Sequence, residues 1–266
     1  MAIALRDDLP PRRFAWVTLG LLIANIAVFL LLQPSAFQNA PDEASPITHE
    51  RQRLLEAEEF ANAWGAIPCE VLSGRALADR PPGCRGLPDG PVPGDKVAVL
   101  ALLTSMFLHG NVPHIVGNLW FLWVFGNNVE DRLGRAWFLC LYLVGGLVAA
   151  MGFVVTNPHG VQPLVGASGA IAAVMGAYLV FHPRGRILAL IASAAFQVVY
   201  VPAAIVLVLF FVTQFMTPGE DVAWQAHVAG MVFGFLAALA LGRLPSVRRR
   251  AELDAADIAL RAGEAF

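Results

Sequence analysis

Charge is absent from five long stretches of this chain, and that absence limits its fold more than any other feature. No Asp, Glu, Lys or Arg occurs in 14–41, 97–129, 136–183, 187–219 or 222–242. A membrane-crossing helix needs about 20 apolar residues, and these stretches supply them. Charged residues make up 14% of the chain, whereas about a quarter is usual in globular domains. The sequence therefore predicts an all-α polytopic membrane protein.

Composition argues against several classes of protein. The net charge is −2 and the chain holds a single lysine, so no basic surface is available for nucleic acid. Three cysteines in 266 residues are too few for a disulfide-stapled scaffold. No internal repeat is evident, which argues against the inverted-repeat plan of many transporters.

We expect six membrane spans. The first covers 14–33, and its apolar run is longer than the roughly 7–15 residues of a cleavable signal peptide, which is the alternative for this position. Residues 97–108 are too few to cross and are expected to re-enter or to lie in the interface. The five further spans are placed at 112–125, 137–155, 166–181, 187–216 with a kink at Pro202, and 222–241.

The arginines indicate how these spans are oriented. They occur in both terminal segments and in the turns at 130–135 and 184–186, whereas the loops 156–165 and 217–223 carry no Lys or Arg. Positive residues near span ends mark the cytoplasmic side. The expected plan is a cytoplasmic tail at 1–13, a first span at 14–33, an extracytoplasmic loop at 34–96, a core with five spans at 97–243 and a cytoplasmic tail at 244–266.

The expected extracytoplasmic loop, 34–96, differs in composition from the rest of the chain. It contains ten acidic and six basic residues and is rich in Pro and Gly. Cys69 and Cys84 both lie in it. An extracytoplasmic compartment allows the two cysteines to pair. Two free thiols are the alternative, and the sequence leaves both open.

Ionisable residues at membrane depth mark function, because burying them in lipid is costly. No carboxylate falls inside an expected span, which argues against intramembrane aspartyl proteases and proton-coupled carriers. The HExxH motif of zinc metalloproteases does not occur in the sequence. The polar candidates that remain are His109, His114, Asn118, Ser168 and His227.

Four of these candidates are expected at one depth. The second, fourth and sixth spans all run from outside to inside, and His114, Asn118, Ser168 and His227 lie in their first turns. A lone serine in a membrane helix usually serves helix packing. A serine that shares a layer with an imidazole is a candidate nucleophile with its base.

His114 and Asn118 are four residues apart and share one helix face. Both can donate hydrogen bonds, as can the backbone N–H of Ser168 near a helix N-terminus. Three donors beside a nucleophile form an oxyanion hole. A structural hydrogen bond across helices is the alternative for His114. His109, which interrupts the apolar run, is interpreted as structural.

Glycines next to these residues allow helices to approach closely. Gly166 and Gly169 lie beside the serine, and Gly230 and Gly234 form GxxxG after the histidine. Small residues let membrane helices pack backbone to backbone. We therefore expect the fourth and sixth spans to bring the serine oxygen within about 3 Å of the imidazole. GxxxG by itself indicates no more than helix packing.

Three motifs resemble those of the rhomboid family of intramembrane serine proteases, of the bacterial type. In chain order they are His109-x4-His114-x3-Asn118, Gly166-Ala167-Ser168-Gly169 and Ala226-His227-x2-Gly230-x3-Gly234. The segment 127–134 (NNVEDRLG) is also typical of bacterial members. The likeness covers about 97–243 together with the first span.

The resemblance implies a six-helix rhomboid-like bundle and a serine endopeptidase that cuts transmembrane proteins in or near their spans. Ser168 would be the nucleophile, His227 the general base, and His114 and Asn118 the oxyanion donors, with no metal and no cofactor. The implied location is a bacterial inner membrane, with the active site facing the extracytoplasmic side. Transmembrane substrates and the lipid bilayer are the implied partners, and the oligomeric state is left open.

Two positions depart from the family pattern. Ala172 stands where bacterial members often carry an aromatic residue that stacks on the catalytic histidine. Members also often carry Trp-Arg before the LTSMFLH stretch, whereas here Asp95-Lys96-Val97-Ala98 precedes 99–109. A catalytically silent relative that binds membrane clients is the first alternative; Ala172 favours it, while Ser168 and His227 oppose it. A transporter or channel is the second, opposed by the lack of a repeat and of buried carboxylates.

Overall fold

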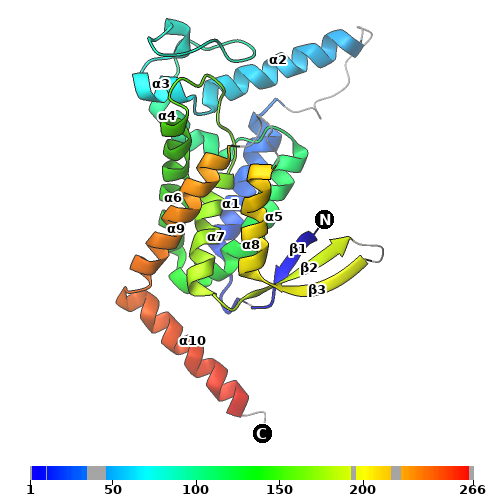
Figure 1. The fold of residues 1–266 in the computed structure, drawn as a ribbon, viewed down its shortest axis with the longest axis vertical. Coiled ribbons are helices and arrows are strands. Elements are labelled where there is room, and N and C mark those ends of the chain that lie inside the picture. The colour runs from blue at the N-terminus through cyan, green and yellow to red at the C-terminus, as the bar shows by residue number, and fades with distance from the viewer. Residues whose placement is uncertain (1, 10, 35–45, 193–195, 217–222, 264–266) are drawn as a thin grey trace.

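A computed structural model describes residues 2–9, 11–34, 46–192, 196–216 and 223–263 of the chain. Most of these residues are helical, and the helices form a bundle with extensions at both ends (Figure 1). The helices are α1 Trp16–Ala27 with a π-helical continuation Val28–Leu32, α2 Pro46–Trp64, α3 Pro68–Ser73, α4 Ala98–Thr104, α5 Val112–Leu133, α6 Arg135–Thr156, α7 Ser168–Phe181, α8 Ala203–Met216, α9 Trp224–Leu241 and α10 Pro245–Gly263. Short 3-10 turns occur at Leu77–Asp79 and Ser105–Phe107. The strands are β1 Ala2–Asp7, β2 Arg186–Ala192 and β3 Phe196–Pro202.

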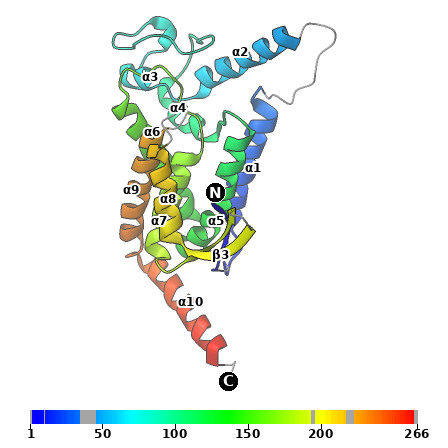
Figure 2. The same cartoon turned by 45° about the vertical axis from the view of Figure 1, so that its right-hand side comes forward.

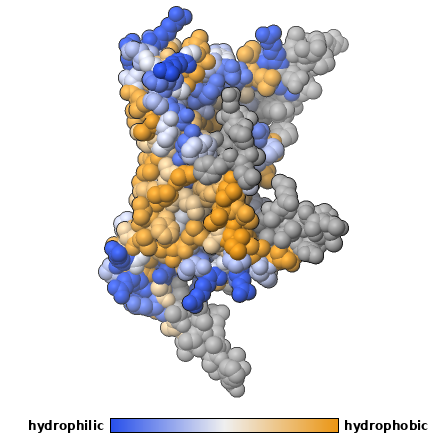
Figure 3. All heavy atoms as spheres, viewed as in Figure 1, coloured by the Kyte–Doolittle hydropathy of each residue, from blue (hydrophilic) through white to orange (hydrophobic). Residues whose placement is uncertain are grey.

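On the face shown in Figure 3, apolar surface covers the middle of the bundle, with hydrophilic surface above and below it. Among the described residues, α6 and α9 are each long and apolar enough to cross a membrane. The pair Ala98–Phe107 and Val112–Leu133, bent by 79°, is a third crossing segment if it is taken as one span. Trp16–Leu32, Ser168–Phe181 and Ala203–Thr213 are apolar but shorter. The expectation of a mostly helical membrane protein is confirmed.

α7 lies at the centre of the bundle, where it packs against α5, α6 and α9 (Figures 1 and 2). Residues 169–178 of this helix are all buried. A Cβ on Gly234 would lie 1.9 Å from the Ala173 carbonyl oxygen, and one on Gly176 would lie 2.2 Å from the Met231 carbonyl oxygen. The backbones of α7 and α9 are therefore in direct contact, which only small residues permit.

α5 extends further than the sequence indicated. We expected the span to end at 125 and a charged turn to lie at 130–135, but the helix continues to Leu133 and ends at Gly134, whose φ of +83° suits glycine. Glu130 is consequently buried, and its carboxylate accepts hydrogen bonds from the backbone N–H groups of Val17 (3.0 Å) and Thr18 (2.7 Å). A carboxylate there satisfies free N–H groups and complements the helix dipole, so α5 fixes the start of α1.

The expected continuous span over 187–216 is wrong, and so is the all-α expectation for this part of the chain. β2 and β3 form an antiparallel hairpin, β1 pairs with β2, and α8 begins at Ala203. Val and aromatic residues, which favour strands, dominate 196–201. Pro202 in addition disfavours a helical conformation for the residue before it. The sheet lies at the opposite end of the bundle from α2 (Figure 1).

α2 and α10 project from opposite ends of the bundle (Figure 2). At the α2 end, Cys69 and Cys84 form a disulfide, which answers the question that the sequence left open. Glu70 and Lys96 form an ion pair beside it. Residues 35–45 of the first loop and most of the loop before α9 lie outside the described residues.

Candidate active site

Ser168 and His227 meet at the end of the bundle that carries α2. Ser168 is the first residue of α7, and His227 lies in the first turn of α9. The Ser168 Oγ and the His227 Nε2 are 2.7 Å apart and share a hydrogen bond. The imidazole is 8% exposed, so this contact is largely shielded. A hydroxyl at this distance from an imidazole can pass its proton to the ring as the oxygen attacks an electrophile.

Small residues at the crossing of three helices allow this contact. A Cβ on Gly230 would lie 2.2 Å from the Gly169 carbonyl oxygen. A Cβ on Gly169 would lie 2.6 Å from the Ala149 Cβ of α6. Because neither glycine carries a side chain, α6 and α9 can both pack against the first turn of α7. This close packing brings His227 on α9 within hydrogen-bond distance of Ser168 on α7.

His114 lies close to the loop that precedes the serine. It stands in the first turn of α5, where the Asn111 side chain accepts a hydrogen bond from the His114 backbone N–H at 2.8 Å. The His114 Nδ1 accepts from the Gly110 N–H at 3.4 Å, so the neutral ring carries its proton on Nε2. A Cβ on Gly166 would lie 2.9 Å from that Nε2. Gly166 has φ of +128°, and this close approach requires a residue without a side chain.

Asn118 lies one turn further along α5 and is 8% exposed. Its side-chain Nδ2 is buried and has no hydrogen-bond partner among the described residues. An unpaired buried donor is rare, because leaving it unsatisfied costs about 1–3 kcal/mol. The arrangement therefore places a free donor on the same helix face as His114.

His109 connects the site to the first helix. Its backbone N–H donates to the Gln33 side chain at 2.9 Å, and its carbonyl accepts from the same side chain at 2.9 Å. The buried ring packs edge-on against the His114 ring, with 5.2 Å between centroids. These contacts fit a residue that holds the break between α4 and α5 in place.

Phe210 is a neighbour of the site that the sequence did not reveal. Its ring, on α8, lies 6.2 Å from the His227 ring and 5.1 Å from Phe121 on α5, measured between centroids. Ala172 cannot stack on the histidine, so Phe210 supplies an aromatic surface there from another helix. Ser105 was also missed: its carbonyl accepts a hydrogen bond from the Gly166 N–H at 2.8 Å. No linear pattern joins these residues to the serine, because both contacts are long-range.

No group of three or more His, Cys, Asp or Glu side chains within the described ranges could hold a metal ion.

Comparison with known proteins identifies relatives of this region. The Rhomboid domain family model matches residues 97–244. The human protein "Presenilin-associated rhomboid-like protein, mitochondrial" is 32% identical over 151 residues, which cover 53% of this chain and 38% of that protein. "Rhomboid protease GluP" of Bacillus subtilis is 31% identical over 143 residues, covering 53% of this chain and 26% of that protein.

A plant protein, "RHOMBOID-like protein 9, chloroplastic" of Arabidopsis thaliana, is 31% identical over 137 residues, or 50% of this chain and 30% of that protein. The matched region thus spans well under half the length of each of these relatives. The family model nevertheless covers more than half of the 266 residues here. The resemblance seen in the motifs is confirmed, and the chain belongs to the rhomboid family.

Proposed function

We propose that the chain is an intramembrane serine endopeptidase that hydrolyses peptide bonds in or near the membrane spans of other proteins. The observation that carries this proposal is the 2.7 Å hydrogen bond between the Ser168 Oγ and the His227 Nε2. Three relatives bear the word rhomboid in their names, and one of them is named a protease. Family membership and the serine–histidine geometry support the same reaction class.

Ser168 is the nucleophile and His227 the general base in this mechanism. The His227 Nε2 takes the hydroxyl proton as the Ser168 Oγ attacks the scissile carbonyl carbon. The tetrahedral intermediate collapses to an acyl-enzyme when the imidazolium returns the proton to the leaving amine. Water, deprotonated by the same imidazole, then cleaves the ester and releases the new carboxyl end. The serine hydroxyl is regenerated, so atoms and protons balance over the cycle.

The oxyanion is stabilised by donors from two helices. The His114 Nε2 lies beside Gly166, the Asn118 Nδ2 has no partner among the described residues, and the Ser168 N–H lies in the first turn of α7. N–H groups in a first helical turn have no intrahelical acceptor. Donors held in place before the reaction stabilise the charge that develops on the carbonyl oxygen.

The proposed architecture has six spans: α1, α5, α6, α7, α8 and α9. Both tails, 1–13 and 244–266, lie in the cytoplasm, and the loop 34–96 lies outside. Two supports are the arginines at the cytoplasmic ends and the apolar surface across the middle of the face seen in Figure 3. The dyad then faces the extracytoplasmic side of a bacterial inner membrane, and transmembrane proteins in that bilayer are the substrates.

The direct test is covalent labelling of the purified, detergent-solubilised chain with a fluorophosphonate probe. Wild type should label, and Ser168→Ala should not. His227→Ala should label and cleave at least about 10³-fold more slowly, and the double variant should be no worse than the single ones, because the two residues act as a unit. Ser246→Ala, an exposed serine at the start of α10, is the matched control and should behave as wild type.

Near-normal labelling of His227→Ala would show that the base is misassigned. An unlabelled wild type that is folded by thermal shift would replace the protease with the silent client-binding alternative. Co-purification of membrane proteins with Ser168→Ala and wild type alike would then be expected.

A further inference from the structure

The loop that leads into the serine is held by the first loop of the chain. We call residues 157–167, which join α6 to α7, the serine loop. Backbone groups of Ala66 and Leu164 exchange two hydrogen bonds, of 3.1 and 2.9 Å. The Cys69 N–H donates to the Gly160 carbonyl at 3.1 Å, and the Arg85 N–H donates to the His159 carbonyl at 3.2 Å. The first loop and the serine loop thus run side by side.

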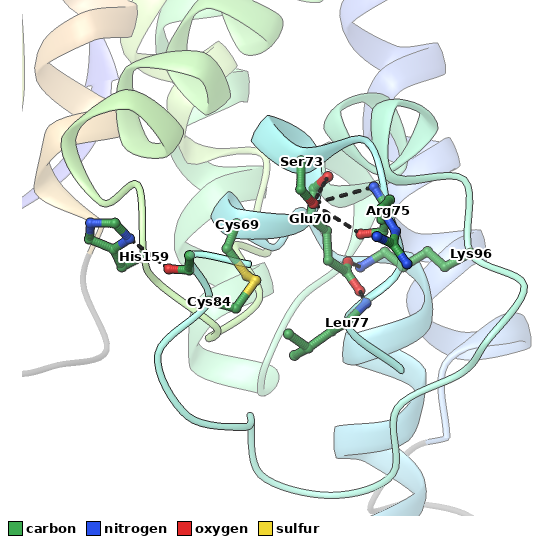
Figure 4. Close-up of a disulfide and its surroundings, with 9 residues drawn as sticks. Cys69, Glu70, Ser73, Arg75, Leu77, Cys84, Lys96 and His159 are labelled. Atoms are coloured by element: carbon green, nitrogen blue, oxygen red, sulfur yellow. Dashed lines mark hydrogen bonds and ion pairs between the residues drawn. A yellow bond between two sulfur atoms is a disulfide. The ribbon is translucent and has the colours of Figure 1, made fainter. Parts of the chain in front are cut away.

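The disulfide joins the two parts of the first loop that hold the serine loop. Cys69 bonds Gly160 directly, and the residues on either side of Cys84 contact His159. Figure 4 shows the disulfide between His159 on one side and the Glu70–Lys96 pair on the other. With the Cys69–Cys84 bond closed, the two contact points cannot separate. With the bond open, the chain between them gains freedom to move away from the serine loop.

A buried ion pair holds the segment around Cys69 on the side away from His159 (Figure 4). The Lys96 Nζ lies 2.6 Å from the Glu70 Oε2, and the two side chains are 2% and 0% exposed. The lysine also donates to the carbonyls of Asn62 (2.8 Å) and Gly65 (2.7 Å). Burial lowers the pKa of Lys96, while the hydrogen bond and charge of Glu70 oppose that shift. Buried charges persist only with such complete pairing, and this is the single lysine of the chain.

Lys96 also leads into the second support of the serine loop. Two residues later α4 begins, and the 3-10 turn Ser105–Phe107 follows it. The Ser105 carbonyl accepts the Gly166 N–H at 2.8 Å, two residues before the nucleophile. The serine loop is therefore held near its start by the disulfide-bonded segment and near its end by Ser105. The first support lies within residues 62–96, and the second follows that segment directly in the chain.

We propose that the Cys69–Cys84 disulfide and the Lys96–Glu70 ion pair together form a brace that positions the Ser168 Oγ through the serine loop. These are positioning residues, since each of them acts through the serine loop. The inference rests on the proposed protease function. Its consequence is that the rate of Ser168 acylation depends on the disulfide, even in protein that stays folded.

The test compares rate with amplitude in fluorophosphonate labelling of the full chain in detergent. In Cys69→Ala/Cys84→Ala we expect the rate constant for labelling to fall at least about tenfold. The final labelled fraction should match wild type, because the protein remains folded. With a transmembrane substrate, kcat should fall by the same factor while KM stays within about twofold, since the brace does not contact the substrate.

A second measurement avoids substitution altogether. Dithiothreitol reduces the disulfide to two thiols and is itself oxidised to a cyclic disulfide. The protein gains two hydrogen atoms in this exchange. Wild type reduced in this way, with the added mass verified, should label at the rate of the double variant, and reductant should not change the variant. Glu70→Gln keeps the length of the side chain but removes its charge, and it should also lower the rate constant for labelling. Cys140→Ser, the exposed free cysteine of α6, is the control and should leave it unchanged.

Two results would overturn the brace. One is a labelling rate constant equal to wild type after loss of the disulfide. The other is a lower labelled fraction at an unchanged rate constant, which indicates a purely structural disulfide. The outcome that contradicts the proposed function is different: wild type itself does not label, and both proposals fall.

Discussion

At the scale of single residues, the amide of Asn118 is one of several buried polar groups that have no hydrogen-bond partner among the described residues. Its Nδ2 is buried and unpaired within the part of the chain that the structure describes. The same helix face carries His114, whose Nε2 lies next to Gly166. An unpaired donor costs stability, and an oxyanion hole is a setting in which the reaction recovers that cost.

Asn118→Ala should lower kcat by about 10²-fold or more, with little change in KM, because the donor acts on charge that develops in the transition state. Asn127→Ala is the matched control: the same change nine residues along α5, where the Asn127 side chain accepts from the Asn128 N–H. Initial rates of substrate cleavage in detergent measure both. Equal rates for the two variants would place Asn118 in packing instead of catalysis.

At the scale of elements, the contact between α7 and α9 decides whether the serine and the histidine meet. A Cβ on Gly234 would lie 1.9 Å from the backbone oxygen of Ala173, and that oxygen cannot rotate away as a flexible side chain would. The two helices must then separate, and the site at their outer ends separates with them. α1 offers a contrast, since a Cβ on Gly20 would meet no atom of the described residues within 4 Å.

Gly234→Ala should therefore destabilise the protein by about 1–3 kcal/mol or more, as overpacking does, and should reduce serine labelling. Gly20→Ala makes the same chemical change in open space and should cause no loss, because alanine is the better helix former by about 1 kcal/mol. Thermal unfolding in detergent compares the two. Similar melting temperatures for both variants would contradict the close α7–α9 packing.

At the scale of the whole molecule, the first strand is tied to the helices by Asp7. Its carboxylate accepts hydrogen bonds from the Tyr178 hydroxyl at 3.1 Å and from the Asn128 side chain. Burial, partly opposed by the Tyr178 hydrogen bond, raises the pKa of Asp7 from 3.8 to about 6. Between these values the folded protein holds more protons than the unfolded chain, so its stability falls as the pH rises from about 4 to about 6.

Asp7→Asn keeps an oxygen that both donors can use but removes the titration. The melting temperature of the variant, relative to that of wild type, should therefore increase as the pH rises through this window. Asp7 is partly exposed, so solvent screening reduces the effect to about 1 kcal/mol, or about 2–4 °C. Melting curves of both proteins between pH 4.5 and 8 measure the difference. A constant difference across that range would contradict a raised pKa for Asp7.

The linear sequence was enough to predict a helical membrane protein of the rhomboid family. Charge-free runs indicate helices of membrane-spanning length, because lipid excludes charge. The three motifs can be recognised because each keeps a fixed local spacing. The roles of Ser168, His227, His114 and Asn118 were predicted from those motifs and stay predictions until they are tested.

The pairing of distant segments could not be predicted from the sequence and is seen in the folded structure. β1 bonds to β2 across more than 180 residues, which turned an expected span into a hairpin. The Glu130 side chain caps α1 from 112 residues away. Cys69 forms a disulfide with Cys84, although the sequence also allowed two free thiols. Phe210, which no sequence motif singled out, packs beside His227. Hydrogen bonds and contacts of this kind join residues with no shared local period, so their free energy depends on the packed bundle and leaves no signal in the linear pattern.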